Sequence, residues 1–146
     1  MDFEQLAFIE KWRRRAVRGV VVGLDATRGD TILTLRVADL GPPIDLSGRD
    51  ETGAVRKQRL TIGDRVFVAF RYRVSDATPG TGARTAGALR KGAEIEGALA
   101  AIGDLAELDL DGIKVIVEGD LSAFSAGDTV RVRIADDGAA YVIPTR

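Results

Sequence analysis

One short signature occurs twice in this chain of 146 residues. The six residues from Gly63 to Val68 (GDRVFV) are echoed by those from Gly127 to Val132 (GDTVRV). In each copy a glycine–aspartate turn leads into alternating apolar residues, which is the pattern of a turn followed by a β-strand. Matching glycine-led segments also lie upstream, around Gly19 and Gly97. The likeness spans most of two half-chains and predicts two small β-modules in tandem.

The period of the apolar residues and the turn signals set the expected boundaries. We predict an all-β fold of two tandem OB-like or SH3-like barrels, preceded by one α-helix. The helix occupies residues 1–15, the first barrel residues 16–74 and the second barrel residues 89–146. A Pro- and polar-rich stretch at 41–57 is expected to be a long loop, and a Gly-, Thr- and Ala-rich stretch at 75–88 a linker.

The second module is expected to contain five strands of its own. Asp111-Gly112 predicts a tight hairpin turn, and Asp137-Gly138 predicts another. The final strand, around residues 140–143, is expected to close this second barrel. The module differs from the first chiefly in lacking the long loop, which is consistent with a duplication in which one loop expanded.

The predicted N-terminal helix has a broad apolar side that must be covered. Asp2 and Gln5 have the spacing of a capping box at its start. The apolar side plugs one end of the first barrel or docks on another subunit, and the sequence leaves both open. The long loop adds further interaction candidates. The helix residues concerned are Phe3, Leu6, Phe8, Ile9 and Trp12, and the loop residues are Ile44, Leu46, Arg49, Arg56 and Lys57.

Composition excludes several kinds of chemistry. The chain has no cysteine and no histidine, so disulfides, thiolate nucleophiles, cysteine zinc sites and a histidine general base are all excluded. Glu94 and Glu96 are expected to share a strand face. Such a pair can act as a catalytic acid and base, but it more commonly supplies charges that keep an edge strand soluble. We therefore predict a non-enzymatic protein with no catalytic residues, cofactor or metal. No apolar stretch is long enough to span a membrane, and a cytoplasmic location is expected.

The two half-chains differ in charge. Residues 1–74 contain 14 Lys and Arg against 10 Asp and Glu, whereas residues 75–146 contain 7 against 12. This asymmetry indicates an acidic partner for the first module, or attraction between modules of neighbouring copies. Ordinary variation between solvated faces explains it equally well.

One strand face suggests a nucleic-acid interface. Arg65, Phe67, Arg71 and Arg73 are expected to share the outer face of one strand. Cations beside an aromatic ring are typical of barrels that hold single-stranded nucleic acid. An overall pI near 5.5 argues against this function, which we keep as an alternative.

Two family resemblances follow from these motifs. The run from Arg14 to Val21, with Leu33–Val37 and Ile62–Phe70, resembles the OB-type barrel of baseplate or tail-hub proteins from tailed phages and contractile injection systems. The likeness covers about residues 10–74. It implies a non-catalytic structural or assembly module of a virion or similar particle that self-associates as a homo-oligomer through protein partners.

The second module is similar to another group of small barrels. Glu96-Gly97, Gly119-Asp120-Leu121 and the repeated signature at Gly127 resemble the barrels appended to transporter ATPases and found in molybdate-binding proteins. In those families the barrels bind oxyanions between subunits. The resemblance implies a small-anion-binding barrel as a further alternative to the assembly module and the nucleic-acid binder.

Overall fold

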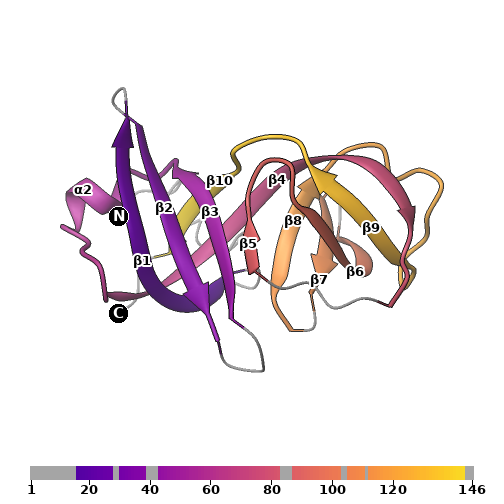
Figure 1. The fold of residues 1–146 in the computed structure, drawn as a ribbon, viewed down its shortest axis with the longest axis horizontal. Coiled ribbons are helices and arrows are strands. Elements are labelled where there is room, and N and C mark those ends of the chain that lie inside the picture. The colour runs from indigo at the N-terminus through magenta and orange to yellow at the C-terminus, as the bar shows by residue number, and fades with distance from the viewer. Residues whose placement is uncertain are drawn as a thin grey trace.

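The computed structural model describes residues 16–27, 30–38, 43–82, 87–102, 105–110 and 112–143. The predicted N-terminal helix and its apolar residues lie outside this part of the chain. Ten strands and one short helix are described, and together they confirm the predicted all-β class (Figure 1). In chain order they are β1 (Val17–Thr27), β2 (Asp30–Val37), β3 (Ile44–Asp50), α2 (Ala54–Lys57), β4 (Arg65–Pro79), β5 (Gly87–Leu89), β6 (Glu94–Ile102), β7 (Leu105–Asp109), β8 (Lys114–Glu118), β9 (Thr129–Ile134) and β10 (Ala139–Ile143).

Nine of the ten strands close into two five-stranded barrels with the same topology, β4 being shared by both, and β5 pairs with β3 outside them. The first has the order β1–β2–β3–β10–β4 and is closed by pairing of β4 with β1. The second has the order β6–β7–β8–β4–β9 and is closed by pairing of β9 with β6. In each barrel four strand pairings are antiparallel and one is parallel. The parallel pairing is β3 with β10 in the first barrel and β8 with β4 in the second. These are OB-like barrels.

The barrels are interlocked because one long strand belongs to both. The first half of β4 pairs with β1 and β10, whereas its second half pairs with β8 and β9 (Figure 1). The first barrel is completed only by β10, which lies near the end of the chain. The predicted boundaries at residues 74 and 89 therefore do not separate the barrels. Each barrel needs a strand from the other half of the sequence.

The repeated signature occupies equivalent places in the two barrels. Gly63 donates its N–H to the carbonyl of Val21 at 2.8 Å, and Gly127 donates to Leu99 at 2.7 Å. Both glycines have positive φ, at 98° and 94°, which favours glycine. The aspartate that follows each glycine accepts a backbone N–H three residues upstream, at 2.9 Å for Asp64 and 2.8 Å for Asp128. The motif recurs because each barrel needs the same turn.

The core runs continuously through both barrels. Along β4 the apolar side chains alternate inward as predicted, while Arg65, Phe67 and Arg73 lie exposed on the outside. Tyr72 is fully buried, and its hydroxyl donates to the carbonyl oxygen of Ser47 at 2.7 Å. Burial raises the pKa of this hydroxyl. The inward residues of β4 are Val66, Val68, Phe70, Tyr72 and Val74, each at most 8% exposed.

Two predicted irregular stretches are largely regular. The expected loop at 41–57 contains strand β3 and helix α2. Ile44 and Leu46, proposed as interaction residues, are core residues at 4% and 0% exposure. Only Asp45 lies between them, and the polar residues that surround this apolar pair in the sequence obscured the strand pattern. The expected linker at 75–88 begins with the last five residues of β4 and ends in β5.

Candidate functional site

Three arginines meet on the outer face of the first barrel. In the β1–β2 ladder Val20 lies opposite Arg36, and in the β1–β4 ladder the same Val20 lies opposite Arg65. Since directly opposed residues share a face, Arg36, Val20 and Arg65 form one row across three strands. Arg18 stands two residues before Val20 and therefore projects from the same face. The barrel thus brings together cations from three separate sequence segments.

These arginines border a shallow cleft of about 520 Å³. Its floor is aliphatic, because β1 turns Val20 and Val22 outward there. Among the residues that the structure describes, no acidic side chain lines it. The lining residues are Arg18, Gly19, Val20, Val22, Arg36, Ala38 and Arg65.

The charge of the cleft is only partly compensated. Arg36 makes a two-pronged ion pair with Asp45, with nitrogen–oxygen distances of 2.8 and 3.0 Å. The hydrogen bond to Asp45 and its negative charge raise the pKa of Arg36. Arg18 and Arg65, by contrast, form no ion pair with any residue in the described ranges. Both residues are exposed, and within the described part of the chain no carboxylate pairs with their donors.

An aromatic ring adjoins the arginines. Phe67 lies opposite Arg18 in the β1–β4 ladder, and the guanidinium carbon of Arg18 is 6.0 Å from the centre of the Phe67 ring. This separation is at the limit of a cation–π contact. Phe67 is 37% exposed. The ring therefore forms an open apolar surface beside the cleft.

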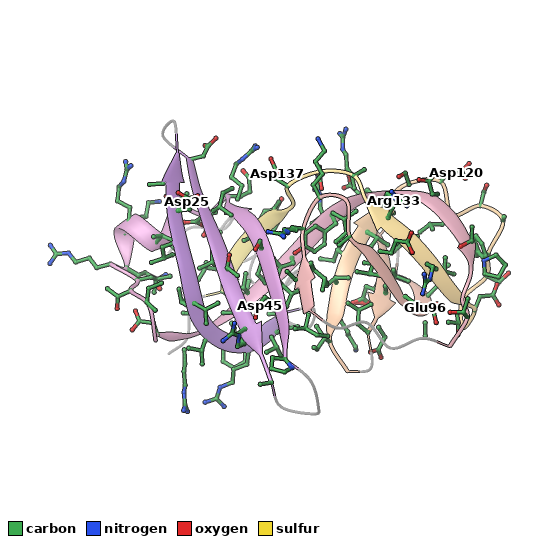
Figure 2. All side chains as sticks on the ribbon, viewed as in Figure 1. Asp25, Asp45, Glu96, Asp120, Arg133 and Asp137 are labelled. Carbon is green, nitrogen blue, oxygen red and sulfur yellow. The ribbon has the colours of Figure 1, made fainter. Side chains whose placement is uncertain are left out.

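The equivalent face of the second barrel has acidic residues at the positions of two of the three arginines. The β6–β7 and β6–β9 ladders place Asp109 and Thr129 on either side of Ala98, as Arg36 and Arg65 flank Val20. Glu96 stands where the first barrel has Arg18, and Arg131 where it has Phe67. Figure 2 shows Glu96 on the second barrel and Asp45, the partner of Arg36, on the first. The cationic cleft therefore belongs to one repeat only.

Glu96 has an internal structural role that its sequence pattern did not reveal. Its carboxylate is buried and accepts the backbone N–H groups of Thr81 at 2.8 Å and Gly82 at 2.7 Å, as well as the Thr81 hydroxyl at 3.2 Å. The guanidinium of Arg131 lies 3.3 Å away. These bonds, the Thr81 N–H first, lower the pKa of Glu96. Glu94 pairs with Arg131 and Arg133 at 2.7 and 3.0 Å, so the two glutamates are members of an ion-pair network.

A second cavity, of about 410 Å³, lies where the two barrels join. Basic and acidic side chains both line it, and one of the basic ones, Arg71, is paired with Glu118 at 2.9 Å. The mixed charge indicates no single class of ligand. The lining residues are Arg49, Glu51, Arg71, Lys91, Ala135, Asp136, Asp137, Gly138, Ala139 and Tyr141.

The predicted nucleic-acid residues are divided by the structure. Arg65 lines the cleft and Phe67 adjoins it beside Arg18, whereas Arg71 is held by Glu118 and Arg73 lies further along β4. Ala69, between the two pairs, is completely buried. The loop candidates Arg56 and Lys57 are exposed in the last turn of α2, away from the cleft lining.

Two features are absent from the described residues. No group of three or more acidic side chains there is arranged to hold a metal ion. No helix among them is both long and apolar enough to cross a membrane.

The sequence had singled out Arg65 as a binding residue but not Arg18 or Arg36, because the three arginines come together only through strand register.

Comparison with known proteins yields a structural match. No protein-family model matches the sequence, and no curated protein matches it. Among solved structures, the fold is similar to the cytoplasmic molybdate-binding protein ModG in a crystal form with molybdate bound. The TM-score is 0.51 at 15% identity, over 90% of this chain and 96% of that one. The resemblance to molybdate-binding barrels, predicted for the second half, thus extends to the fold of both barrels. No comparison supports the predicted relation to phage baseplate, tail or virion proteins.

Proposed function

We propose that this protein is a non-enzymatic binding module that holds a small oxyanion in the cleft between Arg18, Arg36 and Arg65. The observation that carries this function is the pair of exposed guanidinium groups of Arg18 and Arg65, which among the described residues have no ion-pair partner and border a cleft with no acidic lining residue. The assembly function predicted from Phe3, Leu6 and Trp12 rests on residues outside the described part of the chain, and it stays a prediction.

The chemistry of the arginines favours an anion with several oxygens. A guanidinium group presents planar, paired N–H donors that match two oxygens of a phosphate-like or carboxylate group. Arg36 already binds the two oxygens of Asp45 in this manner. Arg18 and Arg65 have the same donors available, and the fold similarity to a molybdate-binding protein supports an oxyanion as the ligand class.

The charge difference between the barrels sets the expected stoichiometry. The second barrel has Glu96 and Asp109 at the positions of Arg18 and Arg36, and acidic side chains repel an anion. We therefore expect one oxyanion per chain, bound at the first barrel. A site completed by groups from two subunits would hold one oxyanion for two chains, and the number of bound oxyanions per chain would then be below one.

Calorimetric titration with molybdate, sulfate and phosphate at low ionic strength tests this function. The substitutions Arg18→Ala and Arg65→Ala should each weaken binding about tenfold, since each removes charge-assisted hydrogen bonds. Arg73→Ala is the matched control, because it removes the same exposed charge from β4 outside the cleft. Binding should also weaken as salt is added.

Two results contradict the proposal. If none of the three oxyanions binds, the cleft is not an oxyanion site. If Arg73→Ala weakens binding as much as Arg65→Ala does, the anions respond to the general charge of the strand and not to the cleft.

A further inference from the structure

The cleft is larger than a bare oxyanion requires. An ion with four oxygens displaces the volume of a few water molecules, at about 30 Å³ each. The cleft of about 520 Å³ lies instead within the range of sites for organic ligands, roughly 300–1,000 Å³. An oxyanion at the arginines leaves most of this space for another part of the same ligand.

The rest of the lining is suited to an apolar, planar group. Val20, Val22 and Ala38 supply an aliphatic surface between the arginines. Phe67 adds a ring at the side of Arg18. Among the described residues Phe67 and Ile62 are the large apolar side chains that stay exposed, and only Phe67 adjoins the cleft arginines. An exposed aromatic ring next to phosphate-binding groups is the arrangement on which nucleobases stack.

From these observations we propose that the ligand of the cleft is a mononucleotide or short nucleotide, with its phosphate on Arg18 and Arg65 and its base against Phe67. This assignment rests on the proposed oxyanion site and specifies its ligand. The second barrel offers no equivalent, because the position of Phe67 is taken there by Arg131, which is paired with Glu94 and Glu96.

The surface also limits the length of the ligand. A long single strand needs cations and rings that continue along the protein. Beyond Phe67 the outer face of β4 continues with the buried Ala69 and then with Arg71, which Glu118 neutralises. The favourable surface is therefore interrupted after Phe67, with Arg73 exposed only further along the strand, and a short nucleotide satisfies it.

Titration of the full chain with adenosine 5′-monophosphate, ribose 5-phosphate, inorganic phosphate and adenosine tests the assignment. The monophosphate should bind at least tenfold more tightly than ribose 5-phosphate or phosphate. Phe67→Leu keeps an apolar side chain but removes the ring, and should weaken only the nucleotide, by roughly tenfold. Ile62→Ala is the matched control, since it trims the other exposed apolar side chain. Arg65→Ala should weaken nucleotide and phosphate together.

Each other outcome overturns the assignment in a recognisable way. Equal affinity for nucleotide and phosphate, or no effect of Phe67→Leu on nucleotide affinity, refutes a nucleotide as the ligand but leaves the proposed oxyanion site unaffected. If the affinity for single-stranded oligonucleotides rises steadily with their length, the surface binds long strands and the mononucleotide assignment is refuted. Failure of every anion to bind refutes the assignment together with the proposed function.

Discussion

Gly138 lies in the turn that returns the chain from the second barrel to the first. Its φ is +79°, and a Cβ atom added there would lie 2.4 and 2.7 Å from two ring carbons of Tyr72 and 3.0 Å from the carbonyl oxygen of Ser47. The Tyr72 ring cannot move aside easily, because it is fully buried and its hydroxyl is bonded to that same carbonyl. Gly138→Ala therefore meets both a backbone penalty and a steric one.

The magnitude follows from these two contributions. A left-handed conformation costs alanine about 1–2 kcal/mol, and overpacking a core costs about 1–3 kcal/mol. The free energy of unfolding should thus fall by about 2–5 kcal/mol. Gly127→Ala is the control: Gly127 has φ +94°, but nothing lies within 4 Å of an added Cβ, so only the backbone cost of about 1–2 kcal/mol applies.

Urea unfolding followed by far-UV circular dichroism measures both variants. The Gly138 variant should be the less stable by about 1–3 kcal/mol, and its melting temperature lower by several degrees, at about 2–4 °C per kcal/mol for a chain of this size. Equal stability of the two variants would refute the close packing of this turn against Tyr72, and with it the described junction of the barrels.

Two further predictions concern the shared strands and Glu96. Fragments 1–79 and 80–146 should not fold separately, because each barrel lacks a strand without the other fragment. The two fragments should regain β-structure when they are mixed. Cooperative unfolding of either fragment on its own would contradict the interlocked topology. The lowered pKa of Glu96 means that its ionised form stabilises the fold above the unfolded-state pKa of about 4.3, and that this stability is lost as the pH falls through the lower folded-state value. Melting temperatures between pH 7 and pH 3 should therefore fall more steeply in the wild type than in Glu96→Gln, and parallel curves would disprove this role.

Much of the local structure could be predicted from the sequence because it depends on neighbouring residues. The alternation of apolar side chains predicted which residues of β4 point inward, from Val66 to Val74. The paired Gly-Asp motifs predicted equivalent turns, since a positive φ and a side-chain cap are local requirements. The short strand β3 was not predicted because its apolar residues Ile44 and Leu46 are few and lie in a polar stretch.

The sequence by itself determined two repeated β-modules, their turns and the inward face of their strands. Only the tertiary structure decided which strands pair, because strand pairing depends on contacts between residues distant in the chain. In it β10, from the second half of the sequence, completes the first barrel, and β4 extends from the first barrel into the second. The cleft has the same origin. Arg18, Arg36 and Arg65 meet because register across three strands places two of them on either side of Val20, and no local pattern in the sequence encodes that register.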